Sequence, residues 1–178
     1  MRHCFRLLLT AALLLPLSAQ ADELIHRKPG LWLIETQMSN SPRKMEQKLC
    51  LDAASDAALQ KLGGQMAAGM TCAKRNLTRN GNQLIYDGVC TMNKSTVTSH
   101  GVTTFAGDIT YHTDSKSHWD PPMMGRADSS TTQNGKWSGP CPADMKPGDM
   151  IMPGGMKMNV VTGEVSGMPM GGMKRPPQ

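Results

Sequence analysis

Long apolar runs, aromatic residues and catalytic motifs are all scarce in this chain of 178 residues. Aromatic residues account for 4% of it, and no stretch reaches the roughly 18 apolar residues that a membrane-spanning helix needs. Motifs of serine hydrolases (G-x-S-x-G), zinc proteases (H-E-x-x-H) and phosphate-binding loops (G-x-x-x-x-G-K-[ST]) are absent. These absences argue against a transmembrane segment and against enzymes of those classes, and we expect no catalytic function.

The first 21 residues have the pattern of a secretory signal peptide. A positively charged start is followed by the apolar run Leu7–Leu15 and by the small-x-small motif Ala19-Gln20-Ala21. We expect cleavage after Ala21 and a mature periplasmic protein that begins at Asp22.

Positive charge is modest and is spread along the chain. The net charge of +5 falls to +3 when Arg2 and Arg6 leave with the leader, because residues 1–21 contain no acidic residue. No stripe of Lys or Arg remains to neutralise a row of phosphates. We therefore expect no nucleic-acid partner.

Four cysteines remain after the leader and its Cys4 are removed, an even number in a chain expected to be exported. None of them forms a C-x-x-C motif, which disfavours a zinc or thioredoxin-like centre. The remaining cysteines, Cys50, Cys72, Cys90 and Cys141, therefore predict two disulfides.

The turn signal Asn80-Gly81 indicates which cysteines pair. Cys72 and Cys90 each lie nine residues from Gly81, so a hairpin about Gly81 places them opposite each other. A three-residue turn gives that register, whereas a two-residue turn shifts it by one. We predict Cys72–Cys90 and, by elimination, Cys50–Cys141.

Alternating side chains and close turn signals predict a mainly β fold of the α+β class. We expect an antiparallel meander, curved into a half-barrel or packed on one short helix, with two disulfides, over residues 22–141. The expected strands cover Leu31–Met38, Lys44–Cys50, Thr71–Thr78, Gln83–Thr91, Val102–Tyr111 and Gly125–Thr132, the last ending before a turn at Asn134-Gly135. Asp52 is a suitable N-cap for a helix over Ala53–Leu62.

Composition changes after Cys141, where Met, Gly and Pro become frequent and no apolar period survives. We predict a disordered, Met-rich tail over residues 142–178. Val160-Val161 is its one aliphatic pair and could dock on the sheet.

Five short motifs appear in a specific order along the chain. They are Lys28-Pro29-Gly30-Leu31-Trp32, Cys50-Leu51-Asp52, Gly81-Asn82, Phe105-Ala106-Gly107-Asp108 and Gly139-Pro140-Cys141. In these the sequence resembles a bacterial periplasmic family, domain of unknown function three-six-one-seven. The resemblance implies an exported protein with a β-rich domain, and it carries over no catalytic residue, because the family has none established.

Closely spaced methionines in the tail are candidate ligands for Cu(I) or Ag(I), because a thioether is a soft, uncharged donor. They are Met150, Met152, Met156, Met158, Met168, Met170 and Met173. Neighbouring cations such as Lys146 and Lys157 would repel a metal ion. The alternative interpretations are a passive linker, an oxidant trap and an apolar contact surface.

A second candidate copper site lies in the loop expected after Tyr111. It combines two imidazoles with two thioethers, from His112, His118, Met123 and Met124. The alternative is a polar loop without a ligand, because histidines without a fixed frame rarely ligate.

Two functions from different classes follow from these patterns. The favoured one is a non-catalytic binding or interaction domain, whose curved sheet holds a small apolar ligand or a periplasmic partner protein. The floor of its site would be formed by Trp32, Phe105, Ile109 and Tyr111, for which plain core packing is the alternative. The second is a metal-handling protein that binds Cu(I) or Ag(I) through the Met-rich tail.

Overall fold

The computed structural model describes residues 24–62 and 70–166, so residues 1–23, which include the expected signal peptide, residues 63–69 and the last twelve residues lie outside the described part. The elements in chain order are β1 (Gly30–Met38), β2 (Met45–Leu51), α1 (Ala53–Leu62), β3 (Met70–Asn80), β4 (Gln83–Met92), β5 (Ser95–Ala106), β6 (Thr110–Met123), β7 (Arg126–Gly139), β8 (Asp149–Ile151), β9 (Lys157–Asn159) and β10 (Val165–Ser166). None of the described helical segments is long and apolar enough to span a membrane.

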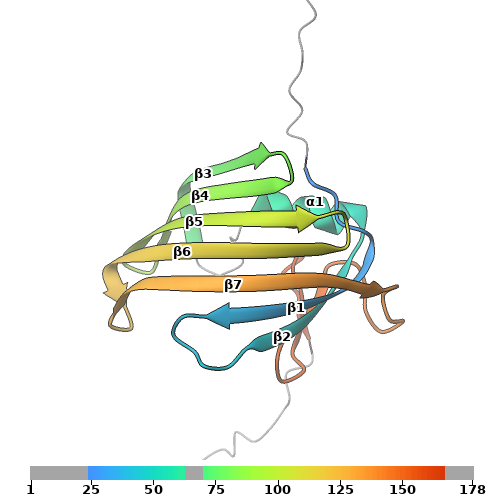
Figure 1. Cartoon of the computed structure of the whole chain (residues 1–178). Coiled ribbons are helices and arrows are strands. Elements are labelled where there is room, and N and C mark those ends of the chain that lie inside the picture. The colour runs from blue at the N-terminus through green and yellow to red at the C-terminus, as the bar shows by residue number, and fades with distance from the viewer. Residues whose placement is uncertain (1–23, 63–69, 167–178) are drawn as a thin grey trace, which may run out of the picture.

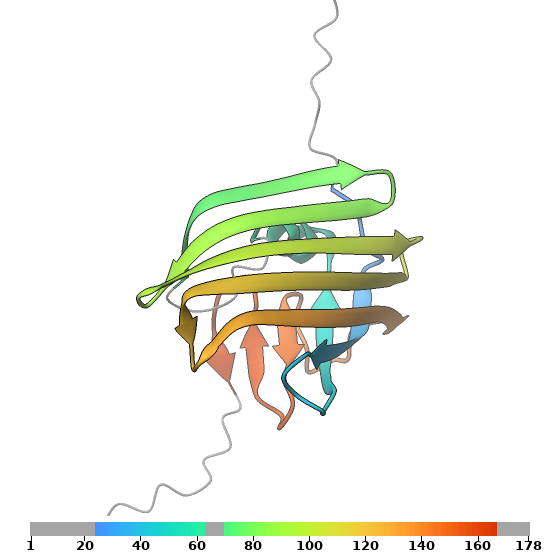
Figure 2. The same cartoon turned by 60° about the vertical axis from the view of Figure 1, so that its left-hand side comes forward.

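All of the described strands belong to one antiparallel sheet, in the order β10-β9-β8-β2-β1-β7-β6-β5-β4-β3. Strands β3 to β7 form a meander of long hairpins, and β1 pairs with the last of them. The sheet is strongly curved, and α1 lies on its concave side (Figures 1 and 2). This is the curved, mainly β architecture with one short helix that the sequence predicts.

Helix α1 begins where the sequence predicts because Asp52 caps it. The Ser55 amide donates a hydrogen bond to Asp52 Oδ1 (2.7 Å), and the Asp52 amide donates to Ser55 Oγ (2.9 Å). These two reciprocal hydrogen bonds satisfy the backbone amides of Asp52 and Ser55 at the start of the helix. The hydrogen bonds from Ser55 lower the pKa of Asp52, so the cap is charged at neutral pH.

The core lies between the concave face and α1, and three aromatic rings form its centre. The Tyr111 ring lies 5.6 Å from that of Trp32 and 6.0 Å from that of Phe105, centroid to centroid. Burial of such rings supplies much of the hydrophobic stabilisation of a domain with few aromatic residues. The other buried members of the cluster are Ile34, Leu49, Leu51, Met150 and Val160.

Both expected disulfides are present. Cys50–Cys141 joins the end of β2 to the chain after β7, and Cys72–Cys90 joins neighbouring strands of the β3–β4 hairpin. Disulfides of this kind are typical of an oxidising, extracytoplasmic compartment.

The β3–β4 hairpin reaches the predicted pairing by an unexpected route. Asn80 pairs with Gln83, so the turn has two residues, and this alone would shift the register by one. An irregularity between Cys72 and Lys74 shifts it back, so that Cys72 lies opposite Cys90.

The prediction of one strand over Val102–Tyr111 is wrong. The chain turns at residues 107–109, so β5 ends at Ala106 and β6 starts at Thr110. Gly107 has a φ of +66°, which only glycine adopts readily, and this permits the tight turn. Ile109 consequently lies in the turn and is 45% exposed, so it does not belong to the floor of a binding site.

The turn predicted at Asn134-Gly135 and the loop predicted after Tyr111 are wrong as well. Both segments belong to the β6–β7 hairpin, in which Gly135 pairs with Tyr111. Gly135 has no side chain because the Tyr111 ring occupies the space that a Cβ would need. The polar residues of β6 alternate between the two faces without an apolar face, which gives a strand the sequence pattern of a loop.

The predicted tail starts at Pro142, yet the sheet continues through β8, β9 and β10 to Ser166. Met150 pairs with Leu49 of β2, and Met145, Met150 and Val160 are buried. Methionine thus supplies here the apolar contacts that Leu or Ile supplies elsewhere, which a search for aliphatic periodicity misses.

Candidate ligand-binding site

A cavity of about 350 Å³ lies between the concave face of the sheet and α1. Its apolar lining comes from Leu49, Leu59, Leu84, Phe105 and Met150, among others. These side chains belong to five different elements, so the cavity is formed by the fold as a whole. Cavities of this size and composition are typical of sites for small organic molecules.

The floor of the cavity is polar and made of small side chains. Gly101 provides no side chain at all, and the Thr103 and Thr113 hydroxyls are hydrogen-bonded to each other at 2.8 Å. A flat molecule can therefore approach the strands closely at this floor.

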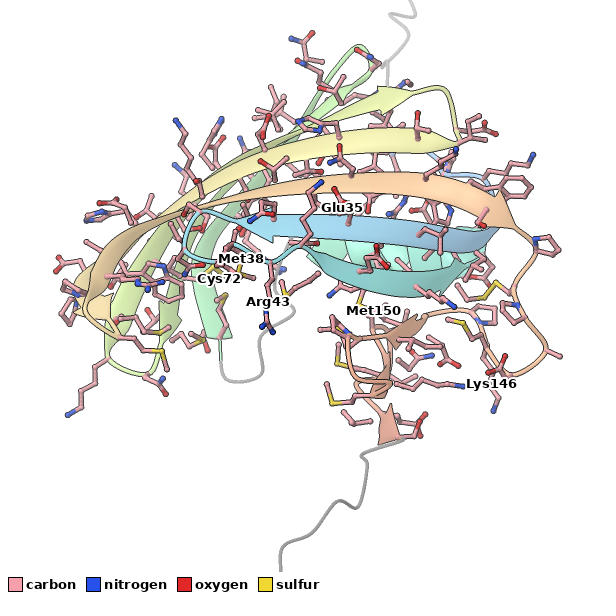
Figure 3. The ribbon with its side chains drawn as sticks, turned by 60° about the horizontal axis from the view of Figure 1, so that its bottom comes forward. Glu35, Met38, Arg43, Cys72, Lys146 and Met150 are labelled. Carbon is pink, nitrogen blue, oxygen red and sulfur yellow. A yellow bond between two sulfur atoms is a disulfide. The ribbon has the colours of Figure 1, made fainter. Side chains whose placement is uncertain are left out.

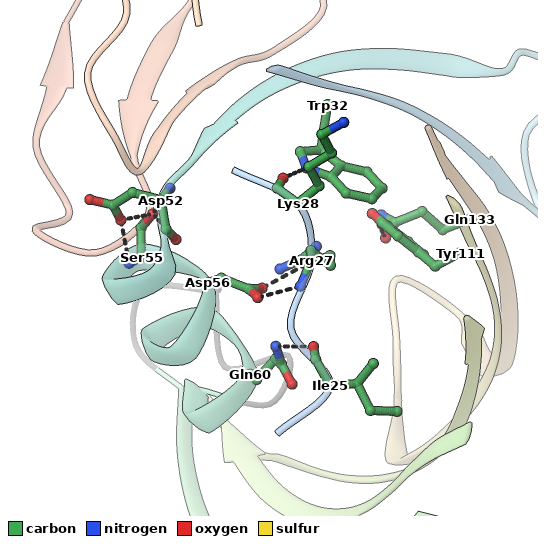
Figure 4. A network of polar contacts seen from close by, with 10 residues as sticks. All are labelled: Ile25, Arg27, Lys28, Trp32, Asp52, Ser55, Asp56, Gln60, Tyr111 and Gln133. Atoms are coloured by element: carbon green, nitrogen blue, oxygen red, sulfur yellow. Dashed lines mark hydrogen bonds and ion pairs between the residues drawn. The ribbon is translucent and has the colours of Figure 1, made fainter. Parts of the chain in front are cut away.

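The chain before β1 runs between α1 and the sheet and closes one side of the cavity (Figure 4). Asp56 of α1, which is 1% exposed, accepts hydrogen bonds from the Arg27 backbone amide (2.9 Å) and from Arg27 Nε (2.7 Å). The charge of Arg27 is thereby neutralised inside the protein, as a buried ion requires.

The Arg27 guanidinium also lies against two rings. Its Cζ is 5.8 Å from the centroid of the Trp32 ring and 5.5 Å from that of Tyr111. The Tyr111 hydroxyl donates a hydrogen bond to Gln133 Oε1 (3.1 Å), and burial raises the pKa of Tyr111 despite the nearby Arg27. Tyr111 is therefore a neutral donor that is already occupied, rather than a proton-transfer group.

Among the described residues, Gln60 provides the one buried side-chain oxygen or nitrogen without a hydrogen-bond partner, and this residue belongs to the cavity lining. Its Nε2 donates a hydrogen bond to the Ile25 carbonyl at 2.9 Å, which fixes the orientation of the amide (Figure 4). Its Oε1 is buried and has no hydrogen-bond partner, and the residue is 8% exposed. An unpaired buried acceptor costs about 1–3 kcal/mol, so a hydrogen-bond donor that reached Gln60 Oε1 would recover free energy of that order.

A larger hollow of about 850 Å³ lies on the outer face of the sheet, across β5, β6, β7, β1 and β2. Exposed charged side chains such as Glu46, Lys48 and Lys136 contribute to its lining. Their polar ends are solvated, so this hollow lacks a buried group that requires a ligand. We therefore regard the smaller inner cavity as the candidate site.

The floor residues predicted from the sequence are partly brought together. Phe105 and Tyr111 line the cavity, while Trp32 is fully buried and packs against Tyr111. Ile109 lies in the exposed turn, as described above.

The structure does not bring the four residues of the predicted histidine site together. His112 and His118 are six residues apart on the extended strand β6, which places them about 20 Å apart. Each imidazole has its own partners: His112 contacts Asn134 Oδ1 and Asp114 Oδ2, and His118 contacts Asp128 Oδ1. Met123 and Met124 lie at the far end of β6, and Met124 is 97% exposed.

Four of the predicted tail methionines lie on β8, β9 and the turn between them, namely Met150, Met152, Met156 and Met158. The other three, Met168, Met170 and Met173, lie outside the described residues.

Sequence reasoning missed Arg27 and Gln60, the polar groups that distinguish the cavity. Gln60 follows Asp56 by four residues, so both lie on the face of α1 that meets residues 25–27. That spacing was the available signal, but two polar residues on one helix face usually indicate a solvated surface.

The profile of one protein family, described as "Protein of unknown function (DUF3617)", matches residues 27–141. This range contains all of the residues that line the cavity except Met150. No curated protein and no solved structure matches the chain.

Proposed function

The chain belongs to the DUF3617 family of proteins of unknown function, from which no activity can be carried over, and we propose that it is a non-catalytic binding protein. Its ligand is a small, mostly apolar molecule with a hydrogen-bond donor, held between α1 and the concave face. The observation that carries this proposal is the buried Gln60 Oε1, which has no hydrogen-bond partner and belongs to a residue of the cavity lining.

The chemistry of the lining supports binding rather than catalysis. The described residues that line the cavity include no carboxylate and no imidazole, the groups most used for proton transfer. Arg27 is neutralised by Asp56, so the site has no free charge to attract an anion. An uncharged ligand with an N–H or O–H group is the chemistry that this lining matches.

We place this binding function in the periplasm, on the basis of the leader pattern and the two disulfides. An apolar molecule is sparingly soluble in water, and a protein that encloses it can keep it dispersed in that compartment.

The probe for the test is N-phenyl-1-naphthylamine, an uncharged aromatic amine with one N–H that becomes fluorescent in apolar surroundings. We expect saturable fluorescence on titration into the mature protein. Gln60→Met keeps the side-chain length but removes the acceptor together with the hydrogen bond to Ile25, and it should weaken binding about fivefold to tenfold, which corresponds to loss of one hydrogen bond to the probe.

A matched pair of variants locates the probe. Thr103 lies on the inner face of β5 and Thr104 on the outer face, and each hydroxyl makes a side-chain hydrogen bond across strands. Thr103→Phe should fill the cavity and abolish the fluorescence increase, whereas Thr104→Phe should leave it unchanged. Equal binding by both variants, with circular dichroism showing both folded, would refute the inner cavity as the site.

A further inference from the structure

The β8–β9 hairpin gathers four methionines on one face. Met150 lies directly opposite Met158 in the ladder, and the Met152 amide donates a hydrogen bond to the Met156 carbonyl at 2.8 Å. Residues two apart on a strand share a face, as do residues opposite each other in an antiparallel pair. Met152 and Met156 lie one residue beyond these strands, and their hydrogen bond continues the pairing, so all four residues take positions on the same face of the hairpin, next to β2, where Figure 3 shows Met150.

We propose that this face is a binding site for one soft monovalent cation, Ag(I) or Cu(I). Opposite Cα atoms in an antiparallel ladder are about 4.5–5.5 Å apart, and the next residue on the same face is about 7 Å along the strand. Methionine has a flexible, unbranched side chain, so the sulfurs of such a rectangle can converge on one ion. Thioethers prefer soft ions of this kind.

One sulfur already acts as an acceptor. Gln47 of β2 points its Nε2 at Met152 Sδ, at a distance of 3.3 Å. A lone pair of this thioether is therefore directed at a polar partner and not only packed against carbon. A metal ion bound to Met152 Sδ would take the place of the Gln47 amide as the partner of this lone pair.

The positively charged Lys157, which lies between Met156 and Met158 in the sequence, does not obstruct the proposed site. Lys157 pairs with Ile151 and alternates with Met156 and Met158, so its side chain emerges on the opposite face. Its Nζ donates a hydrogen bond to the Asp144 carbonyl and lies 3.9 Å from Asp149 Oδ2. The charge of Lys157 is thus directed away from the sulfurs and partly neutralised.

The site is accessible from the turn of the hairpin. Met150 is 4% exposed and forms the inner end, while Met152, Met156 and Met158 are half-buried. The turn residues Pro153 to Gly155 are exposed beside Met152 and Met156. Since the cysteines at 50, 72, 90 and 141 are tied up in disulfides, thioethers are the soft donors of this part of the chain.

The test is titration of the folded protein, labelled with ¹³C at the methionine methyl groups, with silver nitrate in chloride-free buffer. We expect saturation at one equivalent, with shifts of the four hairpin methyl signals before any others. Met152→Leu/Met156→Leu conserves volume and should weaken Ag(I) binding about a hundredfold, because it removes two of four ligands.

Two control variants carry the same chemical change elsewhere. Met38→Leu/Met124→Leu removes two methionines outside the hairpin, both at least 36% exposed, and Met168→Leu/Met170→Leu/Met173→Leu removes the last three of the chain. Neither control should change the affinity of the first equivalent. The proposal is overturned if the first equivalent of silver shifts other methyl signals instead of those of the hairpin. It is also overturned if the triple variant abolishes binding of the first equivalent, or if silver shifts no methyl signal.

This proposal goes beyond the apolar-ligand function and is tested separately from it. The methyl shifts of the unaltered protein locate the ion without any variant, so a variant that fails to fold leaves the test intact. Fluorescence with N-phenyl-1-naphthylamine reports the cavity, and its failure leaves the silver result unaffected.

Discussion

Asp56 accepts two hydrogen bonds from Arg27, one from the backbone amide at 2.9 Å and one from Nε at 2.7 Å. The pair fixes the chain before β1 against α1, and both side chains are at most 10% exposed. Asp56→Ala leaves the guanidinium buried without a counter-ion, so we expect a loss of about 3–5 kcal/mol in the free energy of unfolding by urea.

The exposed pair between Lys44 and Glu35 is the control for this prediction. Its atoms are 2.8 Å apart, as close as in the buried pair, but its side chains are 59% and 38% exposed. Glu35→Ala should therefore cost less than about 1 kcal/mol. Similar losses for Asp56→Ala and Glu35→Ala would contradict the structural role of the buried pair.

A second prediction concerns Gly135, which faces the Tyr111 ring. A Cβ at this position would overlap the ring, so Gly135→Ala must displace Tyr111 from its contacts with Trp32 and Phe105. We expect a destabilisation of about 1–3 kcal/mol in thermal or urea unfolding. Gly101→Ala is the matched control in the neighbouring strands, because its Cβ would lie at an ordinary 3.4 Å from Ser115 Cβ and should have a smaller effect.

A third prediction ranks the two disulfides. Cys50 and Cys141 are 91 residues apart in sequence, and Cys72 and Cys90 are 18 apart. In the chain-entropy model, loss of the longer loop costs about 4.5 kcal/mol and loss of the shorter about 3 kcal/mol. Urea unfolding of Cys50→Ala/Cys141→Ala and Cys72→Ala/Cys90→Ala measures both, and the reverse order would show that native packing, not loop closure, dominates.

A fourth prediction concerns protonation of His112. Its two ring nitrogens face two oxygens, Asn134 Oδ1 at 2.7 Å and Asp114 Oδ2 at 3.1 Å. These hydrogen bonds raise the pKa of His112 above its ordinary 6.5. The stability that they contribute is therefore fully present below pH 6.5 and is lost as the pH rises through the folded-state pKa.

The measurement is an NMR titration of the His112 ring. Asn134→Ala and Asp114→Asn should each lower the pKa of His112, whereas Asp128→Asn, which alters the partner of His118, should not. The change in the free energy of unfolding should be small, because the His112 side chain is 49% exposed. A pKa of His112 that is insensitive to both contact variants would contradict the prediction.

The sequence was most informative where local chemistry decides the structure. Asp52 before an apolar stretch predicts the start of α1, and an Asn-Gly turn between two cysteines predicts their pairing. Asn134-Gly135 carries the same turn signal but lies within β7, where Gly135 pairs with Tyr111 and the Tyr111 ring covers it. Gly81 and Gly135 are distinguished only by their tertiary contacts, because the Tyr111 ring lies against Gly135 and nothing lies against Gly81. The local sequence does not reveal this contact.

The candidate site was less predictable for a related reason. Alternation along one expected strand predicted Phe105 and Tyr111 on the same face, but the structure brings them together as opposite residues of the β5–β6 hairpin. The decisive Gln60 becomes notable only because Ile25 occupies its Nε2 and leaves Oε1 unpaired, which is a contact across 35 residues. The methionine face of the hairpin likewise depends on the pairing of β8 with β9, which a Met-rich composition does not reveal.

The family match stops at Cys141, whereas the sheet continues to Ser166 and Met150 of β8 helps to line the cavity. One side chain of the cavity lining is therefore encoded outside the shared region. A different segment after Cys141 would therefore line the inner cavity with other side chains. Since Met150 and Val160 of this segment also belong to the hydrophobic core, a change there alters the shape of the cavity and the stability of the domain together.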